Sequence, residues 1–171
     1  MRRFLLPLIL LALFIGESIF VQVTPHDLLG SGKIAVPHFL MAALLFLTIF
    51  GSKKHGILYG LLFGLLFDIV YVEIIGIYLF LFPVIAFIAT KLMRILQTNI
   101  AMASIIVILG ISLLETGVYQ MNLLIHHTDM EFAVFLSSRL LPTLMLNAIF
   151  IILAVYPFKR LSEKFADSLN E

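Results

Sequence analysis

Six long runs of apolar residues, separated by short polar segments, cover most of this chain of 171 residues. The runs are roughly 15 to 26 residues long, and a helix needs about 20 residues to cross the hydrocarbon core of a bilayer. We therefore predict an all-α polytopic membrane protein with six transmembrane helices in one bundle. The predicted spans are residues 1–23, 36–50, 57–72, 74–93, 100–125 and 132–156.

Two of these spans have informative starts. The first run begins after Arg2 and Arg3, which is the pattern of a signal peptide or of a first transmembrane helix. Because the run carries Glu17 near its end and lacks a small-x-small cleavage pattern, we favour the transmembrane helix. In the second span, we expect Pro37 to lie in the first helical turn, where its missing N–H costs little.

The third span carries glycines at a spacing of four residues. Gly56, Gly60 and Gly64 fall on one side of a helix, and Asp68, one further step of four along, continues that side. Small residues let a neighbouring backbone approach closely, so we predict that this face is buried against protein. We also assign a helix-packing role to Gly76, which precedes the next apolar run.

Composition supports the membrane assignment and limits the domain count. Hydrophobic residues make up 62% of the chain and charged residues 12%, which is too little polar surface for a water-soluble protein. We predict one transmembrane domain, residues 1–156, followed by a short cytoplasmic amphipathic tail, residues 157–171. In the tail, Phe158, Leu161, Phe165 and Leu169 recur at helical spacing, which predicts a short helix on the membrane surface or against a cytoplasmic partner.

The basic residues predict the orientation. When the spans are laid alternately through the bilayer, Lys33 alone falls on one side, and Arg139 lies inside the sixth span. The other side receives Arg2, Arg3, Lys53, Lys54, Lys91, Arg94, Lys159, Arg160 and Lys164. The positive-inside rule then places both termini in the cytoplasm. The basic residues form no large cluster, which argues against nucleic-acid binding.

Four charged residues lie inside the predicted spans. Glu17, Asp68 and Glu115 come out about 20, 18 and 22 Å from the cytoplasmic ends of their helices, and Arg139 falls at a similar depth. We predict an intramembrane polar cluster in which Arg139 holds one of the carboxylates. The cluster could hold helices together, bind a partner or ligand, or relay protons, and the acid that Arg139 takes is open.

Other chemistry has weaker support. His126, His127, Asp129 and Glu131 could bind zinc or copper, but such a loop is more often simply solvated, and we expect no metal or cofactor. Cysteine is absent, so thiolate chemistry is excluded. The sequence also lacks a nucleophile elbow, a zinc-protease motif and a phosphate-binding loop. We therefore predict that the protein is not an enzyme.

The segment GLLFGLLFDIVYVEIIGIYLFLFPVIAF resembles the signature of the MreD family, the rod shape-determining membrane proteins of bacteria. The matching residues are Gly60, Gly64, Asp68 and Gly76. Chain length, six spans, cytoplasmic termini and a short basic tail fit the same family.

The resemblance implies a non-enzymatic scaffold subunit of the cell-elongation (rod) complex, the elongasome, which organises peptidoglycan synthesis and cell shape. Its implied partners are the bitopic protein MreC, the filament protein MreB, RodA, a class B penicillin-binding protein and membrane lipids. The family is also similar in fold to the S components of energy-coupling-factor transporters. This similarity implies an alternative function, a subunit that binds a small vitamin-like molecule.

Overall fold

The computed structural model describes residues 2–23, 32–72, 74–96 and 99–170. Met1 and Glu171, the outermost residues of the two predicted domains, lie outside this range. The helical elements are α1 (Arg2–Val23), α2 (Phe39–Phe50), α3 (Lys53–Tyr71), α4 (Ile77–Leu96), α5 (Ile100–Leu124), α6 (Phe132–Phe135), the π-helical turn η1 (Leu136–Leu140) and α7 (Leu141–Asn170).

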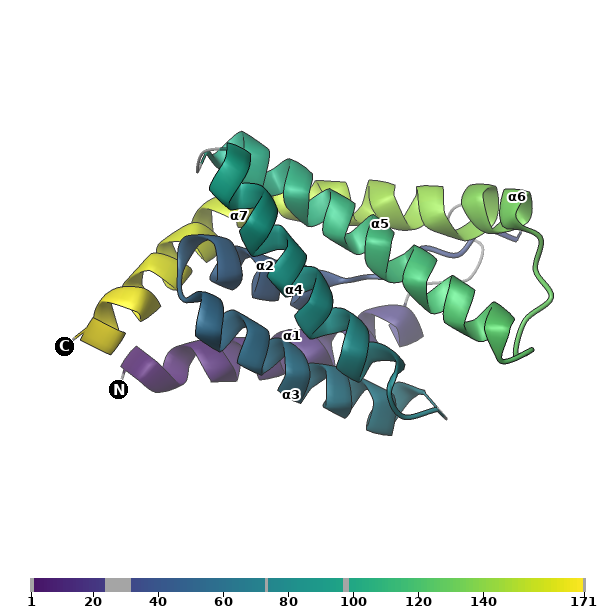
Figure 1. The fold of residues 1–171 in the computed structure, drawn as a ribbon, viewed down its shortest axis with the longest axis horizontal. Coiled ribbons are helices and arrows are strands. Elements are labelled where there is room, and N and C mark those ends of the chain that lie inside the picture. Colours follow the sequence, from purple (N-terminus) through teal and green to yellow (C-terminus); the bar gives the residue numbers. More distant parts are fainter. Residues whose placement is uncertain (1, 24–31, 73, 97–98, 171) are drawn as a thin grey trace.

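The all-α prediction is confirmed. Five helices of the described chain are long and apolar enough to cross a membrane, and α2 is a shorter sixth. Of these five, the last consists of α6, η1 and α7, which form one continuous helix. Both chain ends lie at one end of the bundle, which we call the termini end (Figure 1). At the opposite end, which we call the hairpin end, α3 gives way to α4, and residues 125–131 join α5 to α6.

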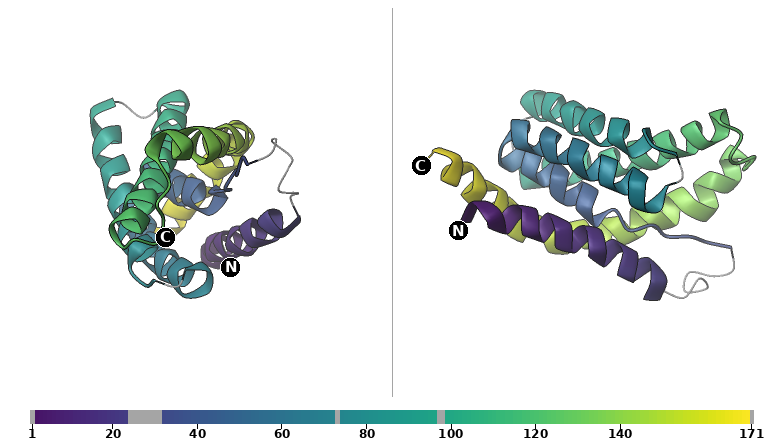
Figure 2. Two further views of the ribbon diagram at one scale, coloured as in Figure 1. Left: turned by 90° about the vertical axis from the view of Figure 1, so that its right-hand side faces the viewer. Right: turned by 90° about the horizontal axis from the view of Figure 1, so that it is seen from below.

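Helix α2 lies in the centre of the bundle, with the other long helices around it (Figure 2). Every residue from Leu40 to Thr48 is buried. A helix that is apolar on all sides has no face to give to water and is stable only inside other elements. The central position of α2 therefore follows from its sequence, FLMAALLFLTIF.

The start of the second span differs from the prediction. The helix begins at Phe39, and Pro37 lies before it in an extended segment, residues 33–38. Helix α7 supplies hydrogen-bond partners to this partly buried, non-helical backbone: Thr143 Oγ1 accepts from Val36 N (3.0 Å), and Asn147 Oδ1 accepts from His38 N (2.8 Å). Asn147 Nδ2 also donates to Val36 O (2.9 Å). The segment stays extended because it is bonded to a neighbouring helix.

Glycines bring α3 close to its neighbours. A Cβ added at Gly64 would overlap the Tyr78 carbonyl of α4, and one at Gly56 would overlap Thr48 of α2. At Gly60 a Cβ would make ordinary contacts of 3.5 Å with α4. Gly76 differs from the prediction, because nothing lies within 4 Å of its Cβ position. Its φ of 127° instead meets the backbone requirement of the turn before α4.

The tail does not form a separate helix. Helix α7 continues through Pro157, where a missing N–H and ring clash disturb the helix, and it changes direction near the termini end (Figure 1). Its apolar side packs on the protein itself: Phe158 stacks on Phe46 with ring centroids 6.4 Å apart, and Phe165 and His55 form a T-shaped pair with ring centroids 5.4 Å apart. The apolar residues Phe158 and Phe165 of the amphipathic tail therefore pack on the bundle.

Candidate functional site

Asp68 holds the turn between α3 and α4. Its carboxylate accepts hydrogen bonds from Gly76 N (Oδ2, 2.8 Å), Tyr78 N (Oδ1, 2.9 Å) and Leu79 N (Oδ2, 2.9 Å). The first N–H groups of a helix have no partner within the helix, and a negative charge near them also interacts favourably with the helix dipole. Asp68 is completely buried and supplies both effects to α4.

Glu17 has the corresponding task at α2. Its Oε1 accepts from Leu40 N at 2.7 Å, in the first turn of a helix that starts inside the bundle. The side chain of the residue before the helix, His38, makes no capping hydrogen bond, so α1 provides the acceptor. Glu17 and Asp68 are therefore not joined to the ion pair that the sequence predicted for this layer.

Glu115 is the carboxylate that Arg139 contacts. Arg139 Nε donates to Glu115 Oε2 at 2.8 Å, and the other oxygen, Oε1, is 2.6 Å from His38 Nε2. Glu115 and His38 are buried, while 34% of the Arg139 side chain is exposed. The structure thus unites two of the four predicted charges and adds His38, which the sequence analysis missed.

One helical row carries Arg139 and the two side chains that hold the extended segment. Arg139, Thr143 and Asn147 follow one another at four-residue spacing, as the glycines do in α3. Arg139 lies in the π-helical turn η1, and such turns often occur at functional sites. The repeated spacing, together with a histidine directly after Pro37, was the sequence signal that could have revealed the contact between the extended segment and α7.

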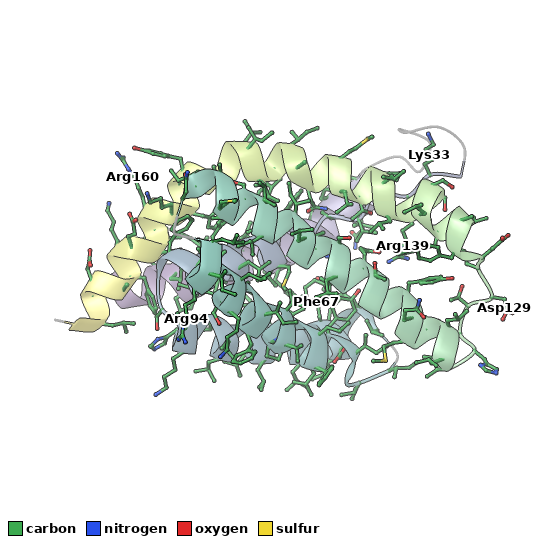
Figure 3. All side chains as sticks on the ribbon, turned by 45° about the horizontal axis from the view of Figure 1, so that its top comes forward. Lys33, Phe67, Arg94, Asp129, Arg139 and Arg160 are labelled. Atoms are coloured by element: carbon green, nitrogen blue, oxygen red, sulfur yellow. The ribbon has the colours of Figure 1, made fainter. Side chains whose placement is uncertain are left out.

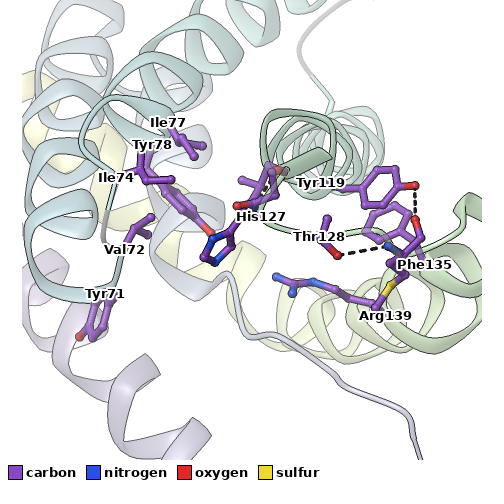
Figure 4. Close-up of a pocket in the computed structure, with 13 residues that line it drawn as sticks. Tyr71, Val72, Ile74, Ile77, Tyr78, Tyr119, His127, Thr128, Phe135 and Arg139 are labelled. Carbon is purple, nitrogen blue, oxygen red and sulfur yellow. Dashed lines mark hydrogen bonds between the residues drawn. The ribbon is translucent and has the colours of Figure 1, made fainter. Parts of the chain in front are cut away.

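A cavity of about 530 Å³ opens at the hairpin end. It is lined by Tyr71, Val72, Ile74, Ile77, Tyr78, Val118, Tyr119, Asn122, His127, Thr128, Met130, Phe135 and Arg139. The guanidinium of Arg139 extends into this space between the walls formed by α4, α5 and η1 (Figure 4). The cavity therefore has a cation on its wall and tyrosine, asparagine, threonine and histidine side chains around it.

The predicted histidine-rich loop contributes to the cavity but assembles no metal site. His127 lines the cavity, while His126, Asp129 and Glu131 are exposed. No group of three or more His, Asp or Glu residues that could hold a metal ion occurs in the described ranges.

These features define a polytopic helical membrane protein with buried polar residues between its helices and a polar cavity open at one end. The profile of the rod shape-determining protein MreD matches residues 2–165. The chain is also 35% identical over 159 residues to the rod shape-determining protein MreD of Bacillus subtilis (strain 168), covering 93% of this chain and 92% of that relative. No solved structure matches it. The chain therefore belongs to the MreD family, whose members are non-enzymatic, multi-pass shape-determining membrane proteins.

Proposed function

We propose that this protein is a scaffold subunit of the cell-elongation complex that binds MreC and thereby helps to organise peptidoglycan synthesis. The observation that carries the proposal is the open cavity at the hairpin end. Its volume is within the range of about 300 to 1,000 Å³ that is usual for binding pockets, so it can admit several side chains of a partner segment. In this proposal the cavity receives the membrane-proximal segment of MreC.

The proposed orientation places both termini in the cytoplasm and the cavity outside. Figure 3 supports it, because Arg94 and Arg160 lie at the termini end while Lys33 lies at the hairpin end. A cavity on the outer side faces the region where the extracytoplasmic part of a bitopic protein leaves the membrane. Contacts with MreB would then involve the termini end, and RodA and the class B penicillin-binding protein would join through the membrane.

Cysteine labelling in whole cells tests the orientation. A cysteine at Gly32, an exposed residue at the hairpin end, should react with an impermeant thiol reagent, whereas cysteines at Lys53 and Lys164 should be protected. Since the natural chain has no cysteine, each variant reports one position. Labelling at Lys53 with protection at Gly32 would reverse the proposed orientation.

Co-purification with MreC from the same organism tests the function, and two adjacent residues give a matched pair. Ile74 lines the cavity, whereas the side chain of Ile75 is 66% exposed on the outer surface. We expect the wild type and Ile75→Trp to recover MreC from detergent extracts and Ile74→Trp, which fills part of the cavity, to lose it. Equal recovery by both tryptophan variants would contradict the cavity as the binding site.

The second candidate function is a small-molecule-binding subunit with the S-component fold. The polar side chains on the cavity wall favour it, because they resemble the few placed polar groups of a ligand pocket. Native mass spectrometry and protein identification of the purified complex separate the two functions. A tightly held small molecule together with ABC-type ATPases would replace the scaffold proposal, whereas recovery of MreC supports it.

A further inference from the structure

We propose that Arg139 is the receptor for an anionic side chain, an aspartate or glutamate of the partner segment that enters the cavity. This inference rests on the proposed function, which supplies the partner, and it adds the chemistry by which the partner is recognised.

The geometry of the ion pair directs its positive end into the cavity. Arg139 uses Nε for Glu115, and among the described residues its two terminal nitrogens make no hydrogen bond. Glu115 is 1% exposed and does not line the cavity, whereas the guanidinium of Arg139 does (Figure 4). The pair is therefore a dipole whose negative end is buried and whose positive end meets whatever fills the cavity. None of the described lining residues is acidic.

The guanidinium is also held in place before any partner arrives. His38 occupies one oxygen of Glu115 and Arg139 the other, so the carboxylate that orients the guanidinium is itself fixed. A planar guanidinium with its terminal N–H groups free can bind a carboxylate through two parallel hydrogen bonds. Because the donor is already oriented, less conformational entropy is lost on binding.

Tyr78 offers a second donor on the same cavity wall. Two other tyrosines that line the cavity use their hydroxyl groups within the protein: Tyr71 donates to Phe14 O (3.3 Å) and Tyr119 to Met130 O (2.8 Å). The Tyr78 side chain is only 8% exposed, yet its hydroxyl makes no hydrogen bond within the described part of the chain. Tyr78 lines the cavity and its hydroxyl oxygen is not one of the fully buried polar atoms, so the hydroxyl can donate to water or to a polar group that enters the cavity.

A carboxylate of a protein segment fits this position better than the phosphate of a lipid. The walls of the cavity are the turn between α3 and α4, the last turns of α5 and the start of the α6–η1 helix. The cavity thus lies at the end of the bundle, where chain outside the bilayer approaches. A free metabolite or a lipid phosphate would use the same guanidinium, so the experiment must separate these sources.

The affinity of the full-length chain in detergent for MreC from the same organism tests the inference. We compare the wild type with Arg139→Gln and with the double variant Glu115→Gln and Arg139→Gln, which leaves no buried carboxylate unpaired. Both should bind about 10- to 100-fold more weakly, the effect expected for loss of a hydrogen-bonded charged partner. Lys33→Gln, which removes an exposed cation at the same end, should bind within about twofold of the wild type.

A double-mutant cycle identifies the acidic partner. Each aspartate and glutamate in the membrane-proximal segment of MreC is changed to its amide and measured against the wild type and Arg139→Gln. One amide variant should weaken wild-type binding by the same factor as Arg139→Gln and add nothing further to it. If every acid of this segment combines additively with Arg139→Gln, the inference is overturned.

The outcomes separate the inference from the proposed function. If MreC does not bind the wild type, the proposed function fails, and this inference fails with it. If MreC binds the wild type and the Arg139 variants equally well, the function stands and the inference alone fails. A phospholipid or small anion that the wild type retains in native mass spectrometry and the double variant loses would overturn the assignment of the site to the partner.

Discussion

Asp68 and Arg139 look alike in the sequence, as single charged residues within apolar runs, but their surroundings in the protein are opposite. Asp68 is 0% exposed, and three backbone N–H groups of its own chain satisfy its carboxylate. Arg139 gives Nε to Glu115 and presents its remaining donors to an open cavity. All hydrogen bonds of the Asp68 carboxylate are made within the fold, whereas Arg139 uses only one of its donor nitrogens there.

A charged residue inside a membrane span is by default a candidate for function. Depth in the membrane does not distinguish Asp68 from Arg139, whereas the number of hydrogen-bond partners within the chain does. Asp68 belongs to the segment that carries the family resemblance, but its contacts are those of a residue that shapes the turn before α4. Arg139 lies outside that segment and has the contacts of a binding residue.

Asp68→Asn should have the largest effect on stability. The amide keeps one oxygen acceptor and turns an NH2 group toward N–H donors of α4, so at least one of the three hydrogen bonds is lost. We expect the free energy of unfolding to fall by about 3 kcal/mol, since each hydrogen bond to a charged group contributes about 1.5 to 3 kcal/mol. Unfolding of the purified protein in detergent measures this change.

Asp129→Asn is the control for that experiment, because Asp129 is exposed in the loop between α5 and α6 and its replacement should change stability by less than about 0.5 kcal/mol. A stable Asp68→Asn protein that no longer binds MreC would contradict the contrast drawn between Asp68 and Arg139. Asp68 would then be a binding residue like Arg139.

Gly64→Ala should have the next largest effect on stability. It tests whether α3 and α4 must approach closely at Gly64, one helical turn before Asp68. The added Cβ would overlap the backbone carbonyl of Tyr78, which cannot move aside as a side chain can. We expect a loss of about 1 to 3 kcal/mol, the usual range for overpacking. The same detergent unfolding assay measures it.

Gly60→Ala, one helical turn away, provides the matched variant, since its Cβ would make only 3.5 Å contacts with α4. It should be neutral or more stable by up to about 1 kcal/mol, because alanine favours the helix. Equal destabilisation by both alanines would show that the overall separation of α3 and α4, rather than overlap with the Tyr78 carbonyl, determines which residues fit on this face of α3.

The sequence was sufficient for features that depend on local pattern. Length and hydrophobicity predicted the helices, and the four-residue spacing predicted the close side of α3, because both follow from the geometry of a single helix. The pairing of charges was not predictable in this way. Glu115 meets His38 only because residues 33–38 are extended, and that conformation depends on hydrogen bonds to Thr143 and Asn147, more than a hundred residues later. Such contacts become visible only when α2 and α7 are placed side by side.

The smallest effects on stability are expected for two tyrosine hydroxyls, one hydrogen-bonded within the chain and one not. Tyr119→Phe removes the hydrogen bond to Met130 O and should lower the free energy of unfolding by about 1 kcal/mol. Tyr78→Phe keeps the ring, which stacks on Phe67 with centroids 5.2 Å apart, and removes a hydroxyl without a hydrogen bond among the described residues, so stability should be unchanged.

Binding should respond in the opposite order. If the cavity presents unused donors to a partner, Tyr78→Phe should weaken the affinity for MreC by about two- to tenfold, because a neutral hydrogen bond contributes about 0.5 to 1.5 kcal/mol. Tyr119→Phe should leave that affinity within about twofold, since its hydroxyl already donates to the chain. A Tyr78→Phe protein that loses stability and keeps full affinity would mean that this hydroxyl stabilises the fold. Of the three side chains Tyr78, Tyr119 and Arg139, only Arg139 would then donate to the partner.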